Sequence, residues 1–186
     1  KILFCYDNPP GTPEISGAQD SIGLMMPGVN YAYFEGMYWP SRIESINDEE
    51  TLQFMEQAFY LVPLGPRQYD YHVLENTHID EAGARALSVA TDDCWKAIRE
   101  RDLVGFGRAV RMSYDAQIAM FPNMVNPVMV ELIEKYRSQA LGWKVSGAGG
   151  GGYLILVSEQ PIEHAVRVII RWPSAIRGFQ PSRAGA

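Results

Sequence analysis

The fold is decided by the stretch Lys144-Val-Ser-Gly-Ala-Gly-Gly-Gly-Gly-Tyr153, which is followed directly by the apolar run Leu154-Ile-Leu-Val157. Five of the six residues from Gly147 to Gly152 are glycine, and β-forming residues flank them on both sides. Glycine loses more conformational entropy on folding than any other residue, so a folded chain keeps such a run where the backbone needs positive φ or a close approach. The apolar flanks favour an ordered strand–loop–strand unit over a flexible linker.

A glycine-rich loop of this kind also has a chemical meaning. Successive backbone N–H groups in such a loop can converge into a concave nest that favours anions, phosphate above all. The run matches neither G-x-x-x-x-G-K-[ST] nor G-x-G-x-x-G, so the loop alone does not identify a nucleotide site.

Composition narrows the class of protein. A chain of 186 residues with 47% hydrophobic residues can bury a core of its own. The net charge of −6 and the lack of a basic run argue against nucleic-acid binding. Two cysteines, far apart in sequence, predict no disulfide framework and fit a reducing cytoplasm. No apolar run approaches the roughly 18 to 20 residues that cross a bilayer. The three histidines have no metal-ligand spacing, so no metal site is predicted in the chain.

Helices and strands are expected in irregular alternation. Strands are predicted at 1–6, 29–35, 38–46, 58–64, 153–159 and 166–172. Helices are predicted at 16–26, 48–55, 80–101, 103–120 and 126–139, and from Ile162 onward. The helix at 80–101 has apolar residues at the 3.6-residue period, and Asn126-Pro127 supplies an N-cap with proline at the first helical position. The predicted fold class is α+β: a helical cluster on a small, mainly antiparallel sheet, with the glycine loop between a helix and a strand.

The glycine stretch closely resembles the third motif of the GHMP superfamily of small-molecule kinases, a K-x-x-G-x-G-G-G-G-[FY]-type loop before an apolar strand. A second resemblance lies upstream, where Ile15-Ser-Gly-Ala-Gln-Asp-Ser21 is similar to the G-x-Q-D stretch of the sugar-kinase branches. The Met26-Pro-Gly28 that follows, together with Tyr38–Ile43 and Leu61–Arg67, resembles the fucokinase-like branch more than the heptose phosphate kinases. The resemblance covers roughly residues 1–173.

The resemblance implies a division of the chain. Residues 1–46 would be the end of the nucleotide-binding N-terminal lobe, 47–173 the GHMP kinase C-terminal lobe, and 174–186 a tail. The first two family motifs, including the loop that wraps the nucleotide phosphates, have no counterpart in the sequence. The chain, which does not begin with Met, is therefore expected to be the C-terminal part of a kinase, to need the missing N-terminal half, and to be inactive alone.

The same resemblance implies the chemistry and the site. The expected reaction transfers the γ-phosphoryl group of ATP, with Mg²⁺, to a sugar hydroxyl, and L-fucose at its anomeric position is the expected acceptor. Asp20 is the expected catalytic carboxylate, and Gln19 and Arg67 are candidates for substrate binding. The expected phosphate loop comprises Lys144, Ser146, Gly147, Gly149, Gly150, Gly151 and Gly152.

Each of these roles has an alternative. Asp20 could be a solvated helix residue, and Lys144 and Arg67 could be surface cations. The chain could also belong to a different GHMP kinase, such as a heptose phosphate kinase. A reading from another class is a non-catalytic domain that senses a sugar or nucleotide, or binds a partner, and has kept the glycine loop without the chemistry.

Overall fold

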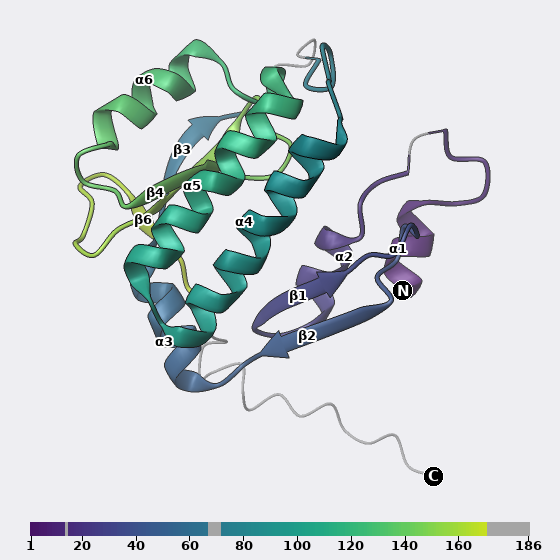
Figure 1. Cartoon of the computed structure of the whole chain (residues 1–186), viewed down its shortest axis with the longest axis horizontal. Helices are drawn as coiled ribbons and strands as arrows, with labels where there is room; N and C mark the ends of the chain where they lie inside the picture. Colours follow the sequence, from purple (N-terminus) through teal and green to yellow (C-terminus); the bar gives the residue numbers. More distant parts are fainter. Residues whose placement is uncertain (14, 67–71, 171–186) are drawn as a thin grey trace. The chain divides into compact units, whose positions relative to one another are not determined.

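The computed structural model describes residues 1–13, 15–66 and 72–170, and it divides into two compact units, Lys1–Leu52 and Gln53–Ile169. Both units mix helices with antiparallel strands, so the α+β prediction is confirmed. Figure 1 shows the elements of each unit. The assignment of residues 1–46 and 47–173 to two kinase lobes stays a prediction.

The first unit holds two short helices and a hairpin. Its elements are α1 (Ile2–Asp7), α2 (Gln19–Met25), β1 (Val29–Tyr33) and β2 (Arg42–Ile46). β1 and β2 pair antiparallel, with Val29 opposite Ile46. Phe4, Ala18 and Ile22 form the small core of this unit, and the Phe4 ring lies 5.6 Å from the Trp39 ring.

The expected strand at 1–6 is wrong, because these residues form helix α1. The sheet described in this unit contains only β1 and β2, so the first residues have no strand to pair with there. Their backbone groups bond locally instead: Cys5 N–H donates to the Lys1 carbonyl and Asn8 N–H to the Phe4 carbonyl. A helix of this kind satisfies its backbone without a neighbouring strand and still buries Phe4.

The second unit is built on a four-stranded sheet. Its helices are α3 (Glu49–Ala58, which begins in the first unit), α4 (Glu81–Glu100), α5 (Leu103–Met120) and α6 (Pro127–Tyr136), with a short 3₁₀ helix η1 (Pro122–Met124). Its strands are β3 (Phe59–Gly65), β4 (Gly142–Val145), β5 (Gly152–Val157) and β6 (Val166–Arg167). The strand order is β4-β5-β3-β6, and each neighbouring pair is antiparallel.

Side chains alternate across this sheet, as strand geometry requires. Tyr60 of β3 belongs to a buried cluster with Met129 and Ile133 of α6, whereas Phe59 packs its ring 5.2 Å from Phe106 of α5. α4 and α5 run side by side and form the most extensive helix pair of the unit (Figure 1). The sheet is therefore covered by helices from two sides.

Side-chain caps fix where the long helices begin. The carboxylates of Asp80 and Asp102 accept hydrogen bonds from Gly83 N–H and Gly105 N–H, at the starts of α4 and α5. The Asn126 side chain accepts from Met129 N–H at the start of α6. Such caps satisfy backbone donors that have no partner within the helix. The predicted helices at 80–101, 103–120 and 126–139 are confirmed, although α6 ends earlier, at Tyr136.

Two other expectations are wrong. No helix begins at Ile162 in the described residues; a turn follows instead, in which His164 takes φ 64°, a left-handed value that interrupts a right-handed helix. The glycine loop does not follow a helix directly, because β4 lies between α6 and the loop. The loop therefore joins two paired strands, which confirms the strand–loop–strand unit expected from its apolar flanks. Of the strand expected at 166–172, β6 covers only Val166–Arg167, and 171–172 lie outside the described residues.

Candidate functional site

The glycine loop is the turn of the β4–β5 hairpin. Val145 pairs with Leu154, and Ser146 N–H then donates to the Tyr153 carbonyl at 2.9 Å, which closes the hairpin below the loop. Gly147, Gly149, Gly150 and Gly152 take φ values of 62°, 77°, 71° and 87°. Side chains rarely tolerate this region of backbone conformation, and four such positions in a loop of six explain why the sequence is glycine there.

The inner side of the loop is braced by a single carbonyl group. Gly150 N–H donates to the Met124 carbonyl at 3.0 Å, and a Cβ on Gly149 would lie 2.2 Å from that same oxygen. Gly149, Gly150 and Gly151 are buried. The brace comes from η1, which follows α5, so the position of the loop depends on the end of that helix.

The outer side of the loop is open. A Cβ at Gly147 or at Gly152 would meet no heavy atom within 4 Å, and both residues are exposed. Backbone at these two positions is accessible to an approaching group. The glycines thus divide into residues packed against Met124 and residues that face open space.

A cavity of about 360 Å³ lies beside the loop. Its lining residues come from the end of β3, the start of α6 and the loop: Leu64, Pro66, Asn126, Pro127, Val128, Met129 and Gly150. Most of this lining is apolar, and the Asn126 side chain is already engaged in capping α6. The cavity offers shape and apolar contact on this side of the loop.

Lys144 does not extend into the loop. Its Nζ donates to Ser113 Oγ at 2.9 Å and to Gln117 Oε1, both on α5. Burial lowers the pKa of Lys144 to about 8, and the nearby Cys94 of α4 opposes that change only in part. Burial likewise raises the pKa of the Cys94 thiol to about 11. A phosphate-binding role for Lys144 and Ser146 stays a prediction.

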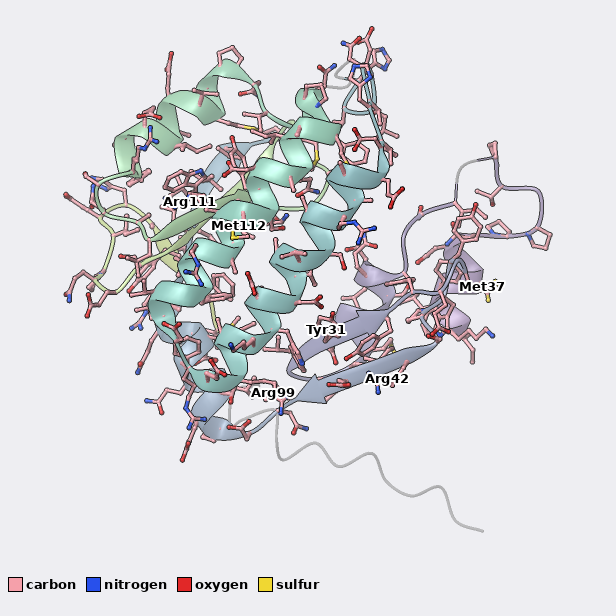
Figure 2. The ribbon with its side chains drawn as sticks, in the orientation of Figure 1. Tyr31, Met37, Arg42, Arg99, Arg111 and Met112 are labelled. Atoms are coloured by element: carbon pink, nitrogen blue, oxygen red, sulfur yellow. The ribbon has the colours of Figure 1, made fainter. Side chains whose placement is uncertain are left out.

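The residue before Lys144 is attached to the same helix. Trp143 is buried, and the guanidinium of Arg111 on α5, labelled in Figure 2, lies 5.6 Å from the centre of its ring. Arg137 approaches the same ring at 5.8 Å. Cation–π contacts of this length are attractive. β4 is therefore held by side chains on both of its central residues.

Asp20 and Gln19 open helix α2 in the first unit, and both are exposed. The carboxylate of Asp20 lies in the first turn, where the helix dipole favours a negative charge. Ser21, next to it, is buried. The catalytic role of Asp20 and the substrate-binding role of Gln19 stay predictions, and Arg67 lies outside the described residues.

The described residues can be tested against the expected cofactors. Exposed backbone at Gly147 and Gly152 is compatible with the approach of a phosphate group. Among the residues that the structure describes, no group of three or more His, Cys, Asp or Glu side chains is arranged to hold a metal ion. Mg²⁺ ordinarily binds one or two carboxylates together with substrate phosphates and waters, so its binding requires no such cage. No described helix is long and apolar enough to cross a membrane.

Comparison with known proteins identifies the class of this fold. Residues 95–173 match the family described as GHMP kinases C terminal. The fold is similar to that of a putative sugar kinase from Campylobacter jejuni, with a TM-score of 0.51 and 14% identity over 77% of this chain and 39% of that one. It also matches the mevalonate kinase of Methanococcus jannaschii over 63% of this chain and 37% of that one, at 16% identity and a TM-score of 0.38, too low to carry an argument.

The sequence comparison adds one curated relative. The chain is 36% identical over 90 residues to the L-fucokinase/L-fucose-1-P guanylyltransferase of Bacteroides fragilis, a match that covers 48% of this chain and 9% of that protein. The glycine hairpin thus lies within the residues that match the GHMP kinases C terminal family, and the partial match to a fucokinase fits the C-terminal portion of such a kinase. The predicted resemblance is confirmed.

Sequence reasoning missed the surroundings of the loop. The Met124 carbonyl, Ser113 and Gln117 were not among the expected site residues. Ser113 and Gln117 are four residues apart on α5, and two polar side chains at that spacing share one helix face. This spacing of two uncharged polar residues on one face of α5 is the signal that could have pointed to a buried polar partner.

Proposed function

We propose that this chain is the C-terminal part of an ATP-dependent sugar kinase that phosphorylates L-fucose at its anomeric hydroxyl. The observation that carries the proposal is the glycine hairpin, which is braced on its inner side by Met124 and open at Gly147 and Gly152. The partial match to a curated L-fucokinase/L-fucose-1-P guanylyltransferase supports the choice of sugar. Cys5 and Cys94 are both free thiols, which supports a place in the reducing cytoplasm.

The proposed reaction is a direct phosphoryl transfer. The bond from the sugar oxygen to the γ-phosphorus forms as the bond from that phosphorus to the β–γ bridging oxygen breaks, and ADP leaves. When bound, ATP supplies the phosphoryl group and Mg²⁺ neutralises charge on it. Catalysis of this kind depends mainly on positioning and on charge stabilisation.

The residues of this chain have three roles in the proposal. The Asp20 carboxylate accepts or orients the proton of the attacking hydroxyl. The open backbone at Gly147 and Gly152 lies against phosphate oxygens, which backbone N–H groups stabilise without reorganisation. Gln19, which is exposed beside Asp20, hydrogen-bonds the sugar. Arg67 provides a second contact to the sugar.

The rest of the phosphate site is proposed to come from a preceding N-terminal region. The chain spans only 9% of its curated relative and 39% of the similar sugar-kinase structure. The phosphate-wrapping motif of the superfamily has no counterpart in these 186 residues. This chain alone should therefore bind Mg-ATP weakly or not at all.

Two experiments test the proposal. The complete kinase that contains this chain is assayed for ADP release with L-fucose, D-mannose and D-glycero-D-manno-heptose 7-phosphate. L-Fucose should give the highest kcat/KM; preference for the heptose phosphate would favour the heptose phosphate kinase alternative. Sugar or nucleotide binding without turnover would favour the sensing alternative. Separately, calorimetry on this chain should find no micromolar affinity for Mg-ATP, and a low-micromolar value would refute the dependence on the N-terminal region.

A further inference from the structure

The sequence motif places Lys144 beside the glycine loop, but the amine of Lys144 is directed away from that loop. It donates to Ser113 Oγ and to Gln117 Oε1, and both acceptors are neutral oxygens on α5. An ammonium bound in this way has little reach left for a ligand beyond Gly147. The contact joins the strand that enters the loop to α5, the helix that is followed by η1 and its Met124 brace.

The attachment matters because β4 is an edge strand. In the order β4-β5-β3-β6 it has β5 as its only strand neighbour in the described sheet. Beyond this strand pairing, α5 provides three contacts to β4 in sequence. Gly142 lies against the backbone of Gly107, Trp143 lies under Arg111, and Lys144 bonds to Ser113 and Gln117.

The contact made by Lys144 is the last of the three before the loop. Only Val145 and Ser146 separate Lys144 from Gly147. The first two contacts use backbone packing and an exposed arginine, whereas this one uses a partly buried, directional group. Burying an amine is unfavourable unless hydrogen bonds compensate for lost water, so an amine at this place is expected to fix a geometry.

We propose that Lys144 is a positioning residue, which ties β4 to α5 and thereby sets the place of the glycine-loop backbone, and that it does not bind phosphate itself. This inference rests on the proposed function of the loop as the phosphate-facing element. It predicts that Lys144 acts through Gly150 and Ser146, whose N–H groups donate hydrogen bonds to the Met124 and Tyr153 carbonyls.

Amide hydrogen exchange of this chain, without ligand, tests the proposal. Lys144→Met keeps the aliphatic stem and removes the donor, and the double variant Ser113→Ala/Gln117→Leu removes the acceptors while Lys144 is kept. Each should speed exchange at Gly150 and Ser146 by at least about tenfold, the effect of losing a hydrogen bond to a charged group. The triple variant that combines all three substitutions should speed exchange no more than Lys144→Met or the double variant does alone, because all of them break the same contact.

Two controls distinguish a positioning role of Lys144 from a general destabilisation of the fold. Lys96→Met, at an exposed site on α4, should leave loop exchange unchanged. Amides inside α4 and α6, such as Ile98 and Ile133, should also be unaffected in the Lys144 and α5 variants, because only a local opening is involved. An equal acceleration at those helical amides, or unchanged exchange at Gly150, would overturn the proposal.

Nucleotide binding by the complete kinase gives the second readout. If Lys144 were a direct phosphate ligand, Lys144→Met would weaken ADP binding while Ser113→Ala/Gln117→Leu would not. Positioning requires both variants to weaken it to a similar degree. Should the complete protein bind no nucleotide, the proposed function fails, yet the exchange result on the ligand-free chain still decides whether Lys144 fixes the loop.

Discussion

Gly142 of β4 and Gly107 of α5 lie backbone against backbone: a Cβ built on Gly142 would be 2.0 Å from the Gly107 carbonyl oxygen. A side chain at position 107 is also excluded, because a Cβ on Gly107 would lie 2.5 Å from the Leu141 Cβ. Both glycines are buried. The distance between this helix and the sheet is therefore set by two residues without side chains.

Gly142→Ala should destabilise the chain substantially. The added methyl group meets backbone that cannot move without shifting α5, and overpacking of this kind typically costs about 1 to 3 kcal/mol or more. Urea unfolding followed by circular dichroism measures the change. Gly23→Ala on α2 is the matched comparison, since a Cβ there meets nothing within 4 Å and alanine favours helix by about 1 kcal/mol. Equal effects of the two substitutions would contradict the close approach.

Alanine should distinguish the two sides of the glycine loop. Gly147→Ala adds only the strain of positive φ, about 1 to 2 kcal/mol, because the space around it is open. Gly149→Ala adds the same strain and a clash with the Met124 carbonyl. Thermal unfolding should therefore show a clearly larger loss for Gly149→Ala. A Tm for Gly147→Ala at or below that of Gly149→Ala would show that the loop is not braced as described.

Stability should rise with pH just above neutrality because of Lys144. Its pKa falls from 10.5 in the unfolded chain to about 8 in the fold, so the unfolded chain binds more protons between these values. Stability increases with pH wherever the unfolded state binds more protons. The free energy of unfolding of wild type, relative to Lys144→Met, should increase by about 1 kcal/mol from pH 8 to pH 9.

Cys94 has the opposite effect and must be allowed for. Its pKa rises from 9.0 to about 11, so the folded chain holds the thiol proton longer and stability falls as pH rises through 9 to 11. Both proteins in the comparison keep Cys94, so the difference between them reports mainly on Lys144. A difference that stays flat from pH 8 to pH 9 would place the Lys144 amine in water rather than beneath α5.

In the complete kinase, Asp20→Asn should lower kcat far more than it changes KM. The amide keeps the shape and hydrogen bonding of the carboxylate but loses its basicity and charge. General-base contributions are typically about 10²- to 10⁴-fold, and a largely dissociative phosphoryl transfer favours the low end. Steady-state kinetics measures the effect, with circular dichroism to check the fold. Turnover within about threefold of wild type would show that Asp20 is a solvated helix residue and not the catalytic carboxylate.

The long helices were predictable because each combines a strong helical period of apolar residues with a recognisable N-cap residue. α5 occupies the predicted residues, 103–120, and its cap Asp102 lies directly before them. The run at 1–6 was not predictable in this way, since a short apolar segment suits either a strand or a helix and its neighbours decide. Arrangement in space is the other limit: the polar partners of Lys144 lie about thirty positions earlier in the chain, on another element.

The brace beneath the glycine loop is a contact between main-chain atoms, from Gly150 N–H to the Met124 carbonyl. Every residue type carries that carbonyl, so the brace itself places no demand on which amino acid occupies position 124. Only the loop side of the contact can be recognised in the sequence, because that side requires glycine. A search for this site by residue identity will therefore find the loop and overlook the support on which it rests, and a redesign that grafts the loop alone will lose its shape.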